Sequence, residues 1–120
     1  MSNFSIKDRI KSFGYAVRGI ALVFRHEHNA WIHLFATLVA LSLGFALGIS
    51  NIEWCIIIIC IASVISAEIM NTAVERIADF VHIEQHDKIR DIKDLAAGAV
   101  LIFSIGAAIC GMIIFLPKMI

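Results

Sequence analysis

The sequence predicts an all-α membrane protein with an amphipathic N-terminal surface helix and three transmembrane helices. Of the 120 residues, 60% are hydrophobic and the mean hydropathy is +0.88, values that are too apolar for a soluble domain of this length. One proline and seven glycines leave little room for long loops, which favours helices. The formal net charge is zero, so no basic field points to nucleic acid. We expect a single domain over residues 1–120, without a linker or an internal repeat.

The first helix is expected over residues 4–27. Its apolar residues recur at alternating spacings of four and three, while basic side chains occupy much of the remaining surface. Such a stripe, placed just before a spanning segment, is typical of a helix that lies on the inner surface of a membrane. The residues of the stripe are Ile6, Ile10, Phe13, Val17, Ile20 and Phe24.

Three apolar runs follow, over residues 30–49, 54–75 and 95–116. Each reaches the roughly 20 residues that a helix needs to cross a bilayer. Residues 50–53 are expected to form a tight connection between the first two spans. Pro117 is expected to end the third span, because proline lacks the backbone N–H that continues a helix.

The distribution of lysine and arginine predicts the orientation of the chain. Five of these residues precede the first span, none lies between the first and second spans, and four lie between the second and third. By the positive-inside rule, the N-terminus and the segment between the second and third spans face the cytoplasm. We therefore expect a multi-pass protein of the cell (inner) membrane, with its active site on the cytoplasmic side.

The second span ends in a one-sided polar stripe. On an α-helix, offsets of three, four, seven and eleven residues share a face, which brings Glu68, Asn71, Thr72, Glu75 and Asp79 together. An ionisable group at membrane depth is costly, and it indicates a functional site by default. Asp79 could instead belong to a solvated face beyond the bilayer. Glu68 is too deep in the apolar run for that interpretation.

These carboxylates are suited to two different tasks. Glu75 lies nearer the polar end and could share Mg²⁺ with Glu27, because this ion is usually held by one or two carboxylates and substrate phosphates. Glu68 lies deeper, where partial desolvation favours the role of a general base towards a lipid alcohol. Lys93, at the cytoplasmic start of the third span, could neutralise phosphate charge. The chain has no P-loop, Rossmann or nucleophile-elbow motif, so phosphate would be handled by metal and side chains.

Two alternatives stay open at this point. Asp94 is as well suited to cap the third spanning helix as to take part in catalysis. A small proton-coupled transporter would also use an intramembrane carboxylate such as Glu68. The transporter interpretation, however, gives no role to Lys93 or to a cytoplasmic cluster with Glu27 and Glu75.

The residues that form this pattern resemble those of a known family. The stretch AEIMNTAVE at residues 67–75, Asp79 after it, and KDLAAGAVL at residues 93–101 resemble the prokaryotic diacylglycerol kinase family of small integral membrane lipid kinases. The resemblance extends over nearly the whole chain and includes Gly14, Tyr15 and Gly19. It implies phosphorylation of a membrane lipid alcohol by ATP with Mg²⁺, in a homotrimer whose sites form between subunits.

The resemblance also implies roles for particular residues. Glu68 would take the proton from the lipid hydroxyl, and Asn71 would organise the site. Glu27 and Glu75 would hold Mg²⁺ on the ATP phosphates and so contribute to nucleotide binding. The other residues implied to contact the nucleotide are Tyr15, Glu84, Gln85, His86, Lys93 and Asp94.

The lipid substrate is less well determined by the resemblance. The stretch EHNAWIHL at residues 27–34 and the small residues AAGA at 96–99 look more like the undecaprenol kinase branch. A serine that the diacylglycerol-specific branch carries near Ala97 is missing. We therefore expect undecaprenol kinase activity, with diacylglycerol as the nearest other substrate.

Overall fold

The computed structural model describes residues 3–81 and 86–120, and within these residues the chain is helical, without strands. The helices are α1 (Ile6–His26), α2 (His28–Leu47), α3 (Asn51–Val81) and α4 (Asp87–Met119). Three of them, α2, α3 and α4, are long and apolar enough to cross a membrane. The predicted fold class is therefore confirmed. Glu84 and Gln85, two of the predicted nucleotide contacts, lie outside the described residues.

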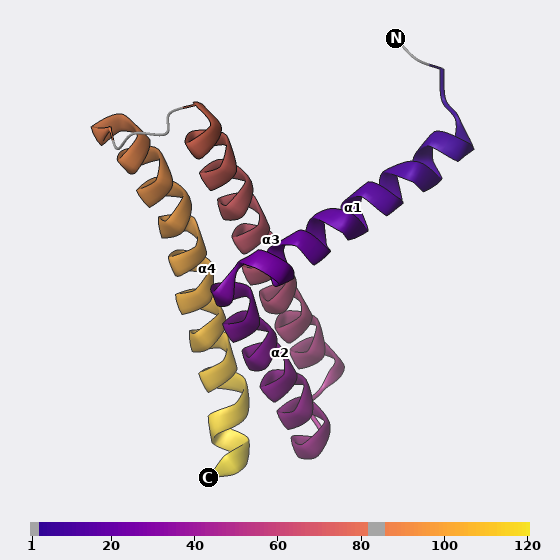
Figure 1. Ribbon diagram of the computed structural model, residues 1–120. Helices are drawn as coiled ribbons and strands as arrows, with labels where there is room; N and C mark the ends of the chain where they lie inside the picture. The colour runs from indigo at the N-terminus through magenta and orange to yellow at the C-terminus, as the bar shows by residue number, and fades with distance from the viewer. Residues whose placement is uncertain (1–2, 82–85) are drawn as a thin grey trace.

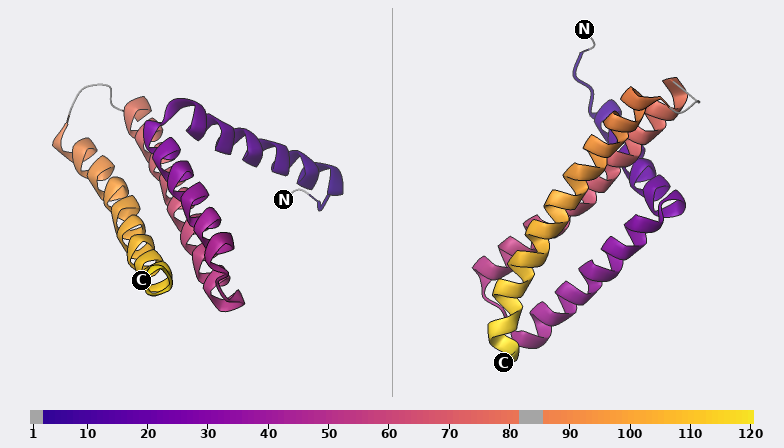
Figure 2. Two further views of the ribbon diagram at one scale, coloured as in Figure 1. Left: turned by 90° about the horizontal axis from the view of Figure 1, so that it is seen from below. Right: turned by 90° about the vertical axis from the view of Figure 1, so that its left-hand side faces the viewer.

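Helix α1 projects sideways from the other three helices (Figures 1 and 2). It begins two residues later than expected, because Ser5 is its N-cap and accepts a hydrogen bond from the Asp8 N–H. Its predicted apolar stripe is largely exposed, as residues such as Ile10, Phe13 and Val17 show. An amphipathic helix with an uncovered apolar face fits the surface of a membrane.

Helix α3 begins earlier and ends later than the predicted span. Ser50 and Glu53 form a capping box: the Glu53 N–H donates to Ser50 Oγ, and the Ser50 N–H donates to Glu53 Oε1. Residues 51–53 therefore form the first turn of the helix rather than part of a loop. The helix is about 46 Å long, which exceeds the bilayer core of roughly 30 Å.

Helix α4 differs from three expectations about the third span. It begins at Asp87 rather than at residue 95, because His86 caps it and accepts a hydrogen bond from the Lys88 N–H. Asp94 lies well inside the helix, so the interpretation of Asp94 as its N-cap is wrong. Pro117 does not end the helix, which continues to Met119. Proline in the last turn removes a single backbone hydrogen bond, and the helix tolerates this loss at its end.

Helices α3 and α4 form an antiparallel hairpin with the most extensive contact between any two helices (Figure 1). An ion pair joins the two helices near each end of the hairpin: Asp79 with Lys93, and Glu53 with Lys118. A small apolar core lies towards the Glu53 end, where Ile49 and the side chains of α3 and α4 pack together. Both helices continue beyond the level of the α1–α2 junction.

Gly44 provides a test of the packing between α2 and α3. A Cβ atom at this position would lie 2.6 Å from the Trp54 ring, so Gly44→Ala would displace the indole. We expect Gly44→Ala to destabilise the fold by about 1–3 kcal/mol, the usual cost of overpacking. Thermal unfolding in detergent, followed by tryptophan fluorescence, measures the effect. Gly106→Ala is the matched control, because a Cβ atom there would meet no neighbouring side chain within 4 Å, and equal stability of the two variants would contradict the expectation.

Candidate active site

The polar stripe of α3 passes from the buried interior to the exposed end of the hairpin. Glu68, Asn71 and Thr72 are buried, Glu75 is half-buried and Asp79 is exposed. Glu68 is only 3% exposed, although it carries a carboxylate. The stripe therefore presents carboxylates at different depths, as the helical spacing predicted.

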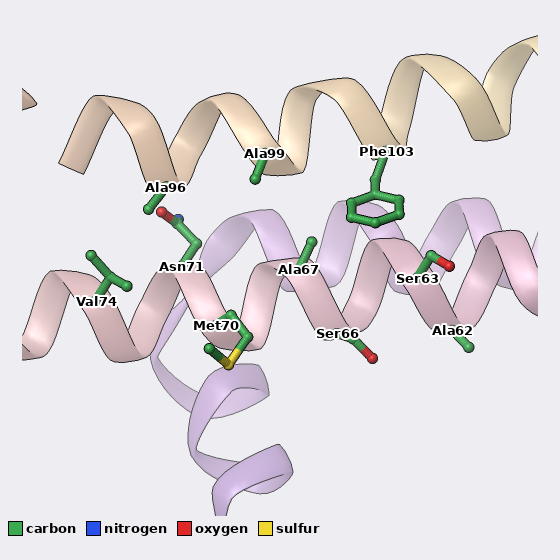
Figure 3. A pocket seen from close by; sticks show the side chains of 10 residues that line it. All are labelled: Ala62, Ser63, Ser66, Ala67, Met70, Asn71, Val74, Ala96, Ala99 and Phe103. Atoms are coloured by element: carbon green, nitrogen blue, oxygen red, sulfur yellow. The ribbon is translucent and has the colours of Figure 1, made fainter. Parts of the chain in front are cut away.

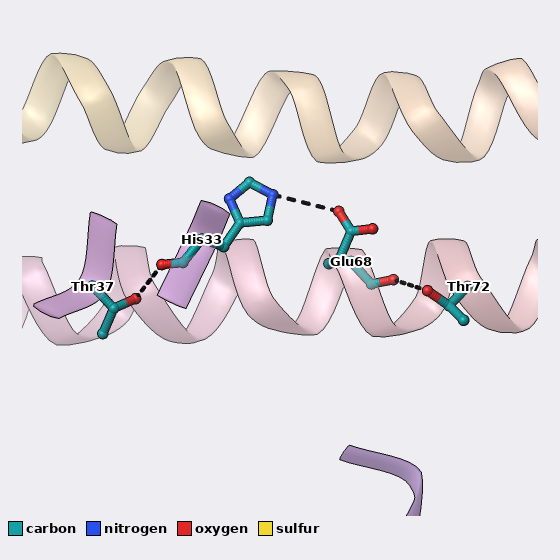
Figure 4. Close-up of polar contacts among 4 residues, drawn as sticks. All are labelled: His33, Thr37, Glu68 and Thr72. Atoms are coloured by element: carbon teal, nitrogen blue, oxygen red, sulfur yellow. Dashed lines mark hydrogen bonds and ion pairs between the residues drawn. The ribbon is translucent and has the colours of Figure 1, made fainter. Parts of the chain in front are cut away.

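Glu68 contacts a residue that the sequence analysis did not assign to the site. His33 Nε2 of α2 lies 3.4 Å from Glu68 Oε2 (Figure 4). The backbone carbonyl of Glu68 also accepts a hydrogen bond from the Thr72 hydroxyl. The signal that could have found His33 is its chemistry, because it is the only ionisable side chain in the run 30–49.

The Glu75 carboxylate lies among several charged groups. It is within electrostatic range of Glu27, Lys93 and Glu68, and the Asn71 side chain hydrogen-bonds to it. The two neighbouring carboxylates repel Glu75, whereas Lys93 attracts it. Charges from the α1–α2 junction, α3 and α4 thus converge around Glu75.

Glu27 reaches this cluster because it is the non-helical residue between α1 and α2. Its backbone is extended, at φ −114° and ψ 119°, and it is both the C-cap of α1 and the N-cap of α2. Its side chain makes no capping hydrogen bond, so capping does not occupy the carboxylate. Residues 3–81 and 86–120 hold no group of three or more His, Cys, Asp or Glu side chains that could bind a metal ion by themselves.

Asn71 also faces a crevice of about 530 Å³ between α3 and α4 (Figure 3). Its buried Oδ1 atom has no hydrogen-bond partner within the described part of the chain. Ala96 and Ala99 of α4 line the opposite wall, so these small residues face a neighbouring helix. The amide therefore keeps one acceptor available beside the carboxylate cluster.

Lys93 projects from α4 towards the exposed end of the stripe and pairs with Asp79. The hydrogen bond from Lys93 to Asp79 raises the pKa of the Lys93 ammonium, which precedes the apolar segment 95–116. Both partners are partly or largely solvent-accessible, with side chains 36% and 66% exposed. Lys93 is therefore a charged group that could exchange Asp79 for a phosphate.

The Asp79–Lys93 pair gives a prediction about stability. Exposed ion pairs contribute little, because solvent screens them and ordering two side chains costs entropy. We expect Asp79→Asn to move the unfolding midpoint by no more than about 3 °C. Thermal unfolding in detergent checks this result. A much larger decrease would mean that the hairpin depends on this pair and that Lys93 is not free to leave it.

The remaining predicted site residues are not gathered in a single chain. Tyr15 is exposed and precedes the end of α1 by 11 residues, which corresponds to about 16 Å along a helix that leaves the bundle. Asp94 is exposed on α4, at a shallow surface that Asp91 and Gly98 also line. The His86 side chain serves as the cap of α4. One chain thus brings together Glu27, Asn71, Glu75 and Lys93 but not Tyr15.

Comparison with known proteins identifies the family to which this arrangement belongs. Residues 14–115 match the family described as prokaryotic diacylglycerol kinase. The chain is 41% identical to undecaprenol kinase of Bacillus subtilis (strain 168), over 91% of this chain and 89% of that protein. It is 32% identical to a diacylglycerol kinase of Synechocystis, over 90% of this chain and 62% of the relative. It is 30% identical to the diacylglycerol kinase of Escherichia coli (strain K12), over 83% of this chain and 82% of the relative.

These matches confirm the resemblance that the residues of α3 and α4 suggested. They extend over most of the chain, including the α1–α2 junction with Glu27 and the whole polar stripe. The chain therefore belongs to the prokaryotic diacylglycerol kinase family, a family of membrane lipid kinases.

Proposed function

We propose that the protein transfers the γ-phosphoryl group of ATP to a membrane lipid alcohol, with Mg²⁺ and with Glu68 as the general base. The observation that carries this proposal is the stripe on α3, where a buried carboxylate precedes a second carboxylate in a charged cluster. A base at that depth is suited to a hydroxyl held at the membrane surface. The relatives reported above are lipid kinases, and no observation favours the transporter alternative.

The donor set around Glu75 fits a hard divalent cation. Glu27 and Glu75 supply carboxylate oxygens from two different elements, and the Glu27 carboxylate makes no capping hydrogen bond. Mg²⁺ usually keeps one or two carboxylates and takes its other ligands from phosphates and water, so a cluster of three protein ligands is not required. When bound, the ion would offset negative charge on the ATP phosphates. Glu27 and Glu75 would hold it, and Lys93 would move from Asp79 to a phosphate oxygen.

In this proposal, the chain's own residues orient the reacting groups. Glu68 removes the proton from the lipid hydroxyl, whose oxygen attacks the γ-phosphorus in line with the departing ADP. Asn71 hydrogen-bonds to Glu75 and keeps its Oδ1 free, which supports a role in organising the site. The further nucleotide contacts that we propose are Tyr15, Glu84, Gln85, His86 and Asp94.

We propose a homotrimer with sites between subunits, because one chain does not bring all the predicted site residues together. Tyr15 lies on α1, 11 residues before its end at the junction with α2, which corresponds to about 16 Å along the helix. A neighbouring copy can supply Tyr15 where the same chain cannot. Many large apolar side chains of α2, α3 and α4 are exposed as well, and they would face lipid or the other copies.

The site lies where α3 and α4 extend past the α1–α2 junction, which we propose to be the cytoplasmic membrane surface. Helix α2 has 20 residues, about the length that crosses a bilayer core. Helix α3 has 31 residues, so its end with Glu75 and Asp79 would emerge from the membrane. The lysine and arginine distribution supports the cytoplasmic side of the cell (inner) membrane.

For the lipid, we propose undecaprenol, with diacylglycerol as the nearest other substrate. The 41% identity to an undecaprenol kinase, against 32% and 30% for two diacylglycerol kinases, supports this choice. The test is transfer of labelled γ-phosphate from Mg·ATP in mixed micelles, with undecaprenol and diacylglycerol in parallel. We expect faster labelling of undecaprenol. No labelling of any lipid alcohol by folded protein would refute the proposed function.

A further inference from the structure

His33 and Glu68 form a polar contact between α2 and α3. The distance between His33 Nε2 and Glu68 Oε2 is 3.4 Å, and the second oxygen of the carboxylate points away from the imidazole (Figure 4). The His33 side chain is 17% exposed and that of Glu68 is 3% exposed. Burying a carboxylate costs desolvation energy, and His33 of another helix is a polar side chain that contacts it.

The space beside the Glu68 carboxylate is narrow, and His33 lines it together with apolar residues. Val23 and Phe24 of α1, Ala30 of α2 and Ile65 of α3 surround the space beside the carboxylate. This space is too small for a water molecule. A proton that Glu68 takes up therefore has no direct path to solvent through this space.

His33 connects Glu68 to a larger space. The imidazole also lines a crevice of about 400 Å³ between α2, α3 and α4. Most residues that line the crevice are apolar, and Thr37 and Ser104 are among its few polar lining residues. His33 is thus the residue that borders both the closed surroundings of Glu68 and an open volume.

Few ionisable groups surround the His33 imidazole. From α3, Glu68 contacts it and Cys60 lines the same crevice. The crevice-lining residues of α4 carry no charge, and the α1 residues beside it are apolar. Among the charged groups, Glu75 lies within electrostatic range of Glu68 but further along the stripe. Glu68 is thus the charged group that His33 contacts.

We propose that His33 is the positioning residue for Glu68 and accepts the proton that Glu68 takes from the substrate, a role that rests on the proposed function. The lipid O–H bond breaks, its proton goes to Glu68, and the oxygen forms a bond to the γ-phosphorus as ADP leaves. The proton then passes from Glu68 Oε2 to the unprotonated Nε2 of a neutral imidazole that carries its own proton on Nδ1, which restores the carboxylate; the imidazolium must then lose the Nε2 proton to return to this tautomer. The imidazolium releases a proton to solvent, so one proton is released for each phosphoryl transfer.

The pH dependence of kcat tests this proposal. A protonated imidazole cannot accept a proton, so we expect kcat of the unaltered protein to fall as the pH decreases. In His33→Gln this decrease of kcat should occur at a different pH, because Glu68 alone then determines it. We also expect kcat to decrease about tenfold, while KM for Mg·ATP is unchanged. An identical pH profile in His33→Gln would overturn the proposal.

Chemical rescue adds a readout that a merely structural role would not change. His33→Ala leaves a space that opens on the crevice, and added imidazole should restore part of its kcat. Thr37→Val is the matched control, because Thr37 lines the same crevice but has no ionisable group, and imidazole should not change its rate. Failure of imidazole to accelerate His33→Ala, when this variant binds Mg·ATP normally, would contradict proton acceptance.

If the variants do not fold, the pH dependence of kcat of the unaltered protein still tests the proposal. A kcat that does not decrease at acidic pH would overturn it, because a protonated His33 could not accept the proton. Absence of lipid phosphorylation by the unaltered protein at every pH would instead refute the proposed function. Normal phosphorylation with an unchanged profile in His33→Gln would refute the role of His33 alone.

Discussion

Glu68→Gln should lower kcat for lipid phosphorylation by about 10²–10⁴-fold, the usual contribution of a general base. Glutamine keeps the size of the side chain and can still face His33, but it cannot accept a proton. Binding of Mg·ATP should be retained, because Glu27, Glu75 and Lys93 are unchanged. Single-turnover phosphorylation in mixed micelles and a nucleotide titration of the same preparation measure the two quantities.

Glu53→Gln is the matched control for this experiment. It makes the same chemical change on the same helix, about 22 Å away at the other end of α3, where Glu53 pairs with Lys118. We expect its kcat to stay near that of the unaltered protein. If Glu68→Gln turned over at a near-normal rate, Glu68 would not be the base. A parallel loss of nucleotide binding would show instead that the substitution disrupts the whole site.

Glu75→Gln should weaken the binding of Mg·ATP by about 10–100-fold, the equivalent of one contact to a charged group. The reason is the loss of one of the two carboxylates that we propose as Mg²⁺ ligands. Titration with Mg·ATP, compared with ATP in the presence of a chelator, measures the metal-dependent part. Unchanged affinity for Mg·ATP would refute the assignment of Glu75 as a metal ligand.

Glu27→Gln and the double variant make this test sharper. If both carboxylates hold the same ion, the two substitutions should not be additive, since either one already disrupts the shared site. In the absence of metal, the stability of the protein should not depend on the Glu75 charge in the same way. Glu75 is repelled by Glu27 and Glu68, so neutralising it should not destabilise the metal-free protein. A large destabilisation of metal-free Glu75→Gln would indicate a structural role.

Local periodicity explains why much of the fold was predictable. The spacing of apolar residues defines the face of α1, and the lengths of the apolar runs define three spanning helices. The polar stripe follows from the same periodicity, since Glu68, Asn71 and Glu75 lie on one helix. These features depend only on residues a few positions apart, so they do not require knowledge of the tertiary structure.

The helix boundaries were less predictable because side-chain caps decide them. The third span was expected to begin only at residue 95, but His86 caps α4 and residues 87–94 form its first two turns. Ser50 and Glu53 likewise begin α3 by a reciprocal pair of hydrogen bonds. Pro117 stays helical because its effect is confined to the last turn. Hydropathy detects the membrane-spanning part of a helix, whereas caps determine where the helix begins.

The sequence by itself determined the class of the protein, its apolar spans and the residues of the polar stripe. Only the tertiary structure decided which groups from other helices meet that stripe. His33 reaches Glu68, Glu27 comes near Glu75, and Lys93 pairs with Asp79 because α2, the α1–α2 junction and α4 pack against α3 at particular heights. Tyr15 stays away because α1 leaves the bundle. Periodicity fixes positions within one helix, but the packing of helices fixes the distances between residues that are far apart in the chain.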